Sequence, residues 1–321
     1  MKGASTPLFC YTPIKMNNKN NKKSEYKKLS CPKCNSEELI KRGFRKTENR
    51  GKIQRYSCKE CSHRFVIDDG FFRMRNAPQK ITLCLDLFYR GVSTRKGQEH
   101  LNAFYPHNSS WVSIYSWVLK YSKVIGNFTD KLKIKASEEL QIDEVEYRVN
   151  KRKAFFIDSI DTETRFMVAS KFVRHRTSEE IKSVLKQVKY KTENQIKIIT
   201  SDGFNDYISA VKVMGVDYRK TKNPSVIRHP VTQLKNEGFN HKIERMHSNI
   251  RERTKVFRGF GSINGAFAIM NGYEIFHNFI RKHQAINCCP YELACPELKE
   301  KLNAPNKWLS LIELANQNNI K

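Results

Sequence analysis

The sequence predicts a mixed α/β fold, a sheet flanked by helices, preceded by a small metal-binding module and an all-helical domain. Three observations lead to this prediction. Two Cys-x2-Cys pairs near the N-terminus indicate the metal-binding module. Residues 78–125 carry apolar side chains at spacings of three and four, which is typical of helices. Residues 138–283 alternate between strand-like and helix-like segments, an order that suits helices packed over a sheet.

Length and charge limit the classes of function. The chain has 321 residues, which leaves room for about two compact domains and a small extra module. Its 59 Lys and Arg residues against 32 Asp and Glu give a net charge of +27, so we expect salt-sensitive binding to a polyanion, with nucleic acid as the leading partner. A basic membrane-surface protein is the competing interpretation. We expect no membrane partner, because no apolar stretch approaches the roughly 18 residues of a spanning helix, and a cytoplasmic protein, because no secretory signal is evident.

Four cysteines form the most specific local signal. Cys31 and Cys34 make the first pair and Cys58 and Cys61 the second. In a reducing compartment such pairs indicate metal, and each can turn two thiolates toward one tetrahedral Zn²⁺. A site of four protein thiolates leaves no open position, so this Zn²⁺ should stabilise the fold and do no chemistry. Four unconnected thiols are the alternative. His63 is an alternative ligand in place of one cysteine, but we expect it to lie just outside the site.

Composition divides the chain into five regions. The first is polar and basic without apolar periodicity, as in a disordered arm. In the second, basic and aromatic residues surround the cysteines and suggest a zinc ribbon whose basic face contacts DNA sugar and phosphate. In the third, helices flank a turn at Gly91 and suggest a helix-turn-helix, although helical hairpins also occur in proteins that never bind DNA. The fourth region is the α/β segment and the fifth is a C-terminal extension. In chain order, the five regions are expected at residues 1–29, 30–70, 76–130, 138–285 and 286–321.

The α/β region contains three acidic residues in distinctive positions. Asp143 falls in the first predicted strand of this region, and Asp202 falls at the carboxyl end of a later strand, where open α/β sheets usually bind ligands. Glu244 lies near the start of a long predicted helix. These carboxylates can meet only if the sheet places the two strands side by side and the helix crosses them. The strands are expected at 140–149, 153–162, 165–173, 196–202 and 216–220, and the helices at 177–189, 205–213 and 240–257.

Three converging carboxylates suit Mg²⁺ or Mn²⁺, hard ions that prefer oxygen ligands. Two such ions about 3.5–4 Å apart can clamp the attacking and leaving oxygens of a phosphodiester, so no protein nucleophile is required. A carboxylate considered alone is usually a solvated residue on the protein surface. Glu144, beside Asp143, and Asp206, one helical turn after Asp202, are neighbouring carboxylates to which we assign no catalytic role.

Three sequence segments carry a resemblance to a known family. QIDEVEY, TSDGFNDY and NHKIERMHSNIRERTKVFRGF resemble the three acidic boxes of DDE-type transposases of bacterial and archaeal insertion sequences. The catalytic core of that family is similar to retroviral integrase and ribonuclease H. The resemblance covers about residues 140–286, and the zinc ribbon and helix-turn-helix extend it to about residue 30. It implies a ribonuclease H-like mixed sheet and a catalytic triad of Asp143, Asp202 and Glu244 that holds two Mg²⁺ or Mn²⁺ ions.

The resemblance also implies an activity and partners. A DDE transposase cleaves DNA at transposon ends and uses the 3′ hydroxyl to attack target DNA. Its partners would be double-stranded terminal inverted repeats and target DNA, with a dimer or larger assembly because two ends are joined, and a prokaryotic protein of this kind would lie at the nucleoid. A domesticated DNA-binding protein with idle carboxylates and a metal-dependent nuclease without strand transfer are the alternatives.

The long helix should also contact DNA. Residues seven apart on a helix lie on nearly one face, so Glu244, His247 and Arg251 should form one stripe toward the substrate. The interval between Asp202 and Glu244 is longer than in many relatives, which suggests an inserted loop near residues 221–238. The expected DNA-contacting residues are Arg245, His247, Arg251, Arg253, Lys255 and Arg258.

Overall fold

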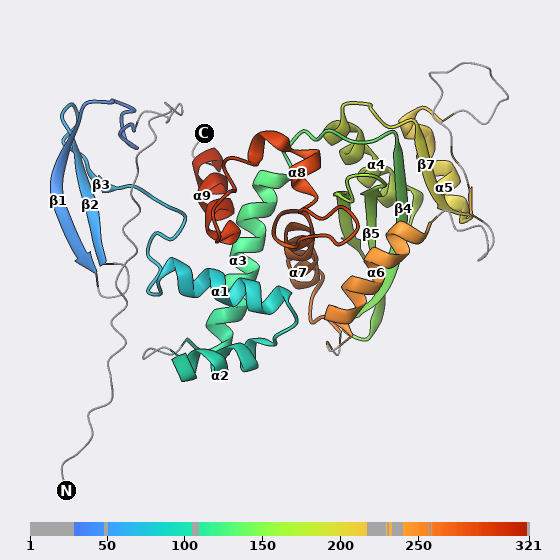
Figure 1. Ribbon diagram of the computed structural model, residues 1–321, viewed down its shortest axis with the longest axis horizontal. Coiled ribbons are helices and arrows are strands. Elements are labelled where there is room, and N and C mark those ends of the chain that lie inside the picture. The colour runs from blue at the N-terminus through green and yellow to red at the C-terminus, as the bar shows by residue number, and fades with distance from the viewer. Residues whose placement is uncertain are drawn as a thin grey trace, which may run out of the picture. The chain divides into compact units, whose positions relative to one another are not determined.

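The computed structural model describes residues 29–47, 51–104, 109–216, 229, 231–232, 240–255, 257 and 259–319 (Figure 1). Almost all of the expected N-terminal arm lies outside the described residues, as do Arg258 and most of the expected inserted loop. The chain divides into two compact units. The first comprises Met1–Thr47 and Lys52–Ile67, and the second comprises Glu48–Gly51 and Asp68–Lys321. Each unit has its own architecture.

The first unit is a small antiparallel ribbon. Its strands β1 (Leu39–Thr47), β2 (Gly51–Cys58) and β3 (Arg64–Val66) form one sheet in that order. Tyr56 stands opposite Phe65 in the β2–β3 pair, and their rings stack with centroids 5.9 Å apart. Most of β1 is exposed. A unit this small buries too little apolar surface to be stable alone and depends on an added cross-link such as a metal ion.

The second unit begins with three helices, α1 (Pro78–Tyr89), α2 (Thr94–Phe104) and α3 (Trp111–Thr129). A proline at the first position of α1 suits a helix start, and the Ser110 side chain caps α3 by accepting from the amide of Ser113. Gly91, at φ +107°, makes the turn between α1 and α2. The three helices pack around a shared apolar core of Ile81, Leu85, Leu101, Ile114, Val118 and Tyr121, each at most 1% exposed.

The larger sheet has five strands in the order β6-β5-β4-β7-β8. Strands β4 (Glu139–Val149), β5 (Arg152–Asp161) and β6 (Met167–Val173) form an antiparallel meander. Strand β7 (Ile198–Asp202) pairs parallel with β4, and β8 (Val231–Thr232) pairs parallel with β7. The predicted mixed sheet is therefore confirmed. The strand expected at 216–220 lies outside the described residues apart from Val216, and β8 supplies the fifth position instead.

Helices pack over this sheet, as predicted. Helix α4 (Ser178–Thr192) packs against β5 and β6, and α6 (His241–Thr254) crosses β4 and β5 (Figure 1). A short helix α5 (Asn205–Ala210) and a 3-10 turn, η1 (Val211–Met214), follow β7 and pack against α4. Helix α7 (Ile263–Ile275) runs into a π-helical turn, η2 (Phe276–Ile280), and lies against β6. Within the described ranges, no helix is both long and apolar enough to cross a membrane.

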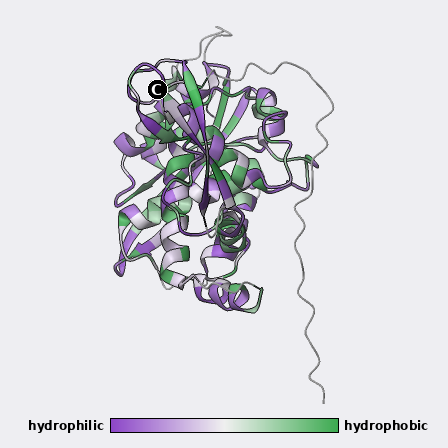
Figure 2. Ribbon diagram, turned by 90° about the vertical axis from the view of Figure 1, so that its left-hand side faces the viewer, coloured by the Kyte–Doolittle hydropathy of each residue, from purple (hydrophilic) through white to green (hydrophobic). Residues whose placement is uncertain are grey.

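The C-terminal extension folds back onto the first three helices. It contains α8 (Tyr291–Ala294), η3 (Pro296–Leu298) and α9 (Lys307–Asn319), and α9 packs against α1 and α3. The indole of Trp308 stacks on Tyr89 at 5.5 Å and donates to Asp86 at 3.3 Å. The helical region and the sheet share one apolar core. Along the helices, hydrophilic and hydrophobic residues are interspersed (Figure 2).

Two glycines allow α3 and α7 to approach closely. A Cβ at Gly272 would lie 1.8 Å from the hydroxyl of Tyr89, and one at Gly126 would lie 2.5 Å from the side chain of Asn271. A larger residue at either position would have to displace the side chains of the facing residues. The contact joins the predicted helix-turn-helix region to the sheet domain, so both belong to one compact unit.

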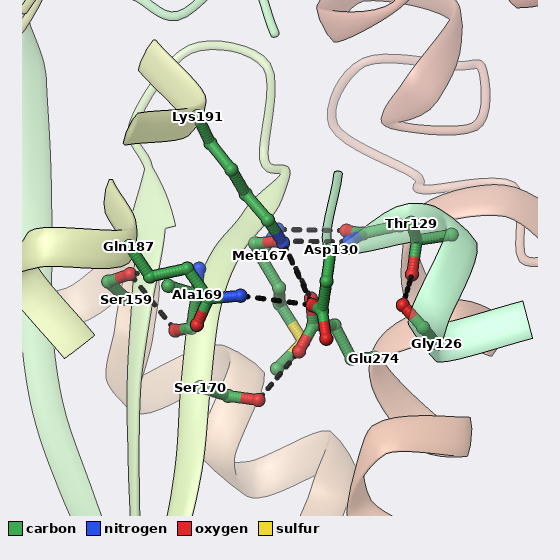
Figure 3. Close-up of polar contacts among 11 residues, drawn as sticks. Gly126, Thr129, Asp130, Ser159, Met167, Ala169, Ser170, Gln187, Lys191 and Glu274 are labelled. Atoms are coloured by element: carbon green, nitrogen blue, oxygen red, sulfur yellow. Dashed lines mark hydrogen bonds and ion pairs between the residues drawn. The ribbon is translucent and has the colours of Figure 1, made fainter. Parts of the chain in front are cut away.

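A buried polar network lies where α3, α4, β6 and α7 meet (Figure 3). The ammonium of Lys191, 1% exposed, lies 3.4 Å from Asp130 and 3.8 Å from Glu274. Ser170 donates to the other carboxylate oxygen of Glu274 at 2.6 Å. Burial raises the pKa of Glu274 to about 7, and the nearby Lys191 opposes this rise only in part.

This network predicts a pH-dependent stability. The pKa of Glu274 in the folded protein, about 7, exceeds its ordinary value of 4.5, so the folded state holds the proton more tightly than the unfolded state. Its stabilising contribution is therefore complete below pH 4.5 and is lost as the pH rises through 7. Glu274→Gln should remove this dependence, so the difference in unfolding free energy between wild type and variant should change by about 3 kcal/mol between pH 4.5 and 8. Urea unfolding followed by circular dichroism measures it, with the exposed Glu300→Gln as control, and a constant difference would contradict the assignment.

Candidate active site

The parallel pairing of β4 and β7 brings two of the predicted carboxylates together. Gln141 stands opposite Thr200 in this pair, so two residues further along Asp143 reaches the level of Asp202. One carboxylate oxygen of Asp143, one of Asp202 and one of Glu144 lie within 4.8 Å of one another. All three residues are half-buried. This acidic group is therefore open enough to admit a cation and its substrate.

Glu144 is an unexpected member of the acidic group. Its side chain is already engaged, because one carboxylate oxygen accepts from the Tyr207 hydroxyl at 2.6 Å and the other forms an ion pair with Arg176. The Arg176 guanidinium in turn covers the ring of Phe204 at 3.6 Å from the centroid. The charge of Glu144 is thus compensated. Tyr207 lies within the TSDGFNDY segment, but no sequence pattern pointed to Arg176.

Glu244 lies in the first turn of α6, is exposed, and is not a member of the acidic group. The charge of Glu244 nonetheless affects the pKa of Asp143. Burial raises the pKa of Asp143 to about 7, the imidazole of His247 opposes this rise, and the charges of Asp158, Asp202 and Glu244 add to it. The structure therefore brings Asp143 and Asp202 into contact range and places Glu244 within their electrostatic reach.

A glutamine of β4 anchors the helix that carries Glu244. The side-chain carbonyl of Gln141, 1% exposed, accepts from the backbone amide of Ile243 at 3.1 Å. This amide is one of the four at a helix start that lack a partner within the helix. Gln141 lies two residues before Asp143, so one strand segment supplies an acidic residue and also fixes the position of the helix opposite it.

His247 lies behind the acidic group and faces away from solvent. Its side chain is 2% exposed, and its Nε2 lies 2.7 Å from Asp158, the cross-strand partner of Asp143. Its Nδ1 lies 3.6 Å from Asp143. Burial alone would lower the pKa of His247, but the charges of Asp158 and Asp143 outweigh burial and raise it. Of the predicted stripe toward the substrate, Glu244 and Arg251 are exposed, whereas His247 is buried and hydrogen-bonded to Asp158.

Arg253 is also buried, which is a second departure from the expected DNA contacts. Its Nε donates to the carbonyl of Phe88 at 2.6 Å, and its guanidinium lies 4.3 Å from the Phe88 ring and 4.6 Å from the Phe257 ring. Burial lowers its pKa to about 10. In this arrangement neither His247 nor Arg253 can reach DNA. Of the other expected DNA-contacting residues, Arg245 in the first half of α6, Arg251 near its end and Lys255 just after it are exposed.

The four predicted cysteines converge in the ribbon. The sulfurs of Cys31 and Cys61 are 3.5 Å apart, as are those of Cys34 and Cys58, and all four lie within 4.8 Å of one another. A tetrahedral ion with Zn–S bonds of about 2.3 Å requires sulfurs roughly 3.8 Å apart. The set therefore fits Zn²⁺. His63 stacks on Phe65 at 6.0 Å and is not a member of this group.

This cluster predicts one tightly held zinc per chain. Cys58→Ser should remove the zinc and unfold the ribbon while the second unit, which has its own core, keeps its structure. Metal analysis gives the zinc content, and hydrogen exchange of residues 31–66 reports the ribbon. Cys288→Ser is the matched control, because Cys288 is half-buried and lies outside the cluster. Full zinc retention in Cys58→Ser would contradict the assignment.

Comparison with known proteins agrees with this geometry. Residues 137–283 match the family model described as "DDE domain". The chain is also 28% identical over 151 residues to the protein named "Putative integrase ORF3" of Spiroplasma virus SpV1-C74, a match that covers 42% of this chain and 40% of that protein. The chain thus spans less than half the length of this relative.

Two solved structures show weaker similarity. The magnesium complex of the HTLV-2 integrase catalytic core domain, in its trimeric form, is 14% identical with a TM-score of 0.36, covering 50% of this chain and 98% of that one. A simian T-cell lymphotropic virus intasome in complex with a PP2A regulatory subunit is 13% identical with a TM-score of 0.37, covering 50% and 55%.

The class of the catalytic segment follows from these observations. It is a mixed α/β domain with acidic residues gathered where β4 and β7 run in parallel. Residues 137–283 match the DDE domain model, which agrees with the sequence resemblance.

Proposed function

We propose that this protein is a DNA transposase that cleaves DNA at transposon ends and joins the resulting 3′ hydroxyl to target DNA. The observation that carries the proposal is the meeting of Asp143 and Asp202 on adjacent parallel strands, inside a segment that matches a DDE domain. Two Mg²⁺ or Mn²⁺ ions, when bound, would activate the attacking oxygen and stabilise the leaving oxygen.

The residues at the site have distinct roles in this proposal. Asp143 and Asp202 would hold the ions together with Glu244, which would complete the set when DNA and metal are bound. A cation beside Asp143 would favour its ionised form despite the burial that raises its pKa. His247, held by Asp158, would fix the orientation of Asp143 from behind.

The remainder of the chain would bind DNA. The net charge of +27 supports a double-stranded DNA partner, here terminal inverted repeats and target DNA. We assign residues 30–70 and 76–130 as the DNA-binding modules, with the exposed Arg95 and Lys96 of α2 directed to the duplex. Since two ends are joined, the working form would be a dimer or larger, and in a prokaryote it would lie at the nucleoid.

A strand-transfer assay tests the reaction. The substrates are DNA duplexes carrying the inverted repeats that flank the coding region, with Mg²⁺ or Mn²⁺. Wild type should give joined products, and Asp202→Asn should reduce them by at least about a thousandfold because a metal ligand is lost. Asp206→Asn, a half-buried carboxylate one helical turn away, is the control and should keep activity within a few-fold. Cutting without joining would indicate a nuclease, and binding alone would indicate a domesticated protein.

A second pair of variants identifies the third carboxylate. Glu144 is already bound by Arg176 and Tyr207, whereas Glu244 is exposed and its charge acts on Asp143. Glu244→Gln should therefore abolish joining, while Glu144→Gln should retain it within about tenfold. Both variants remove one charge and keep nearly the same shape, so each controls for the other. The reverse pattern would transfer the catalytic role to Glu144.

A further inference from the structure

A cavity of about 470 Å³ lies along the part of β4 that follows Asp143 and Glu144. Its walls come from the second half of β4, the last turn of α6 and the segment that follows α6. We call it the β4 pocket. Four consecutive residues of β4, 145–148, line it, and alternate residues of a strand point to opposite faces of a sheet. The cavity therefore meets the edge of the strand.

The sheet topology explains why this edge is accessible. Among the described residues, β7 pairs with β4 only from Glu139 to Gln141, so the later part of β4 extends past its parallel neighbour. The far end of the pocket is closed by Phe260, whose amide donates to the carbonyl of Arg148 at 2.9 Å. Gly259, at φ +109°, permits this contact, since a Cβ there would lie 3.0 Å from the same carbonyl. The pocket is thus built by the fold.

The chemistry of the walls indicates a ligand with a flat apolar part and a negative charge. Val145 and Phe260 are buried at the floor, and the aromatic rings of Tyr147 and Phe257 are half-buried beside them. The rim carries three exposed basic residues, Arg148, Arg251 and Lys255. The rim also includes one carboxylate, Glu146, whose charge is paired with Lys153 at 2.9 Å. A nucleotide has the matching features, a base for the floor and a phosphate for the rim.

The position of the pocket relates it to the reacting phosphate. Val145 lies two residues beyond Asp143 on the same face of β4, which corresponds to about 7 Å along the strand. Arg251 lies two turns beyond Glu244 on α6, about 10 Å along the helix. Each of these lengths corresponds to about one or two nucleotide spacings along a DNA strand. The pocket would therefore lie one or two nucleotides from a phosphate bound at the acidic group.

We propose that the β4 pocket binds one unpaired nucleotide of the DNA substrate, next to the phosphate at which the strand is cut. The base would lie against Val145 and the aromatic side chains, and the phosphate would contact the basic rim. The pocket volume lies within the range of roughly 300–1,000 Å³ found for small-ligand sites. This inference rests on the proposed function for its place beside the cut phosphate, but the binding itself needs no catalysis.

A binding comparison tests the pocket. Two fluorescent 30-base-pair duplexes, one fully paired and one with a single unpaired thymidine at its centre, are titrated with the full chain by anisotropy at one fixed salt concentration and without added Mg²⁺ or Mn²⁺. Wild type should bind the unpaired duplex at least about fivefold more tightly. In Arg148→Gln/Lys255→Gln this ratio should fall to about 1. Lys299→Gln/Lys301→Gln removes the same charge from exposed positions of the C-terminal extension and should keep the wild-type ratio.

A cross-link locates the nucleotide directly. With 5-bromodeoxyuridine at the unpaired position, irradiation should attach the DNA to peptides that contain residues 145–148 or 255–260, as identified by mass spectrometry. A wild-type ratio of 1, an unchanged ratio in the rim variant, or a cross-link confined to other peptides would overturn the proposal. All substituted positions are exposed, and thermal unfolding should verify that each variant is folded.

The outcome separates this inference from the transposase proposal. The Asp202→Asn variant should show the wild-type preference for the unpaired duplex, because that residue is outside the β4 pocket. If strand transfer fails while the preference and the cross-link are observed, the pocket assignment stands alone. If strand transfer succeeds while the preference is absent, only the pocket assignment is lost.

Discussion

The parallel pairing of β4 with β7 is the constraint on which the site depends. Asp143 and Asp202 belong to distant parts of the chain, and only this pairing places them at the same level. It begins at Glu138, whose carbonyl accepts from the amides of Lys197 and Ile198 at 2.8 and 2.9 Å. Buried apolar residues fix the register, because a slip of one residue would turn Leu140 and Ile142 out of the core and point Asp143 to the opposite face.

Several carboxylates close together in a partly buried site repel one another. Positively charged and hydrogen-bonding side chains of the same domain offset part of this repulsion. Arg176 and the Tyr207 hydroxyl engage Glu144, and His247 lies between Asp158 and Asp143. His247 and Tyr207 are buried and Arg176 is half-buried. Glu244, by contrast, is exposed to solvent. The carboxylates of Glu144 and Asp143 thus have charge partners within the protein, while Glu244 is open to solvent. This arrangement is compatible with binding of metal ions and a phosphate.

The sequence predicted the parts of this structure that depend on local pattern, and missed those that depend on distant partners. Cysteine spacing predicted the ribbon cluster, and the strand pattern placed Asp143 and Asp202 in two strands that had to lie side by side, as β4 and β7 do. His247 and Arg253 were expected among the DNA-contacting residues of the long helix, but both are buried. Their partners, Asp158 and Phe88, lie 89 and 165 positions away, a relation that no helical spacing contains. Glu144 was given no catalytic role because it only neighbours Asp143, and no local pattern anticipates its ion pair with Arg176.

Arg253 also explains why the first three helices and the catalytic segment form one unit. It lies on α6, the helix that carries Glu244, yet its guanidinium packs on the ring at the end of α1 and its Nε donates to the carbonyl of Phe88. Separating α1 from α6 would break this hydrogen bond and leave a buried cation without its aromatic contacts, which is costly. Helices α3 and α7 also approach closely at Gly126 and Gly272, where a Cβ would displace facing side chains. The first three helices and α6 are therefore parts of one compact unit rather than two domains joined by a linker.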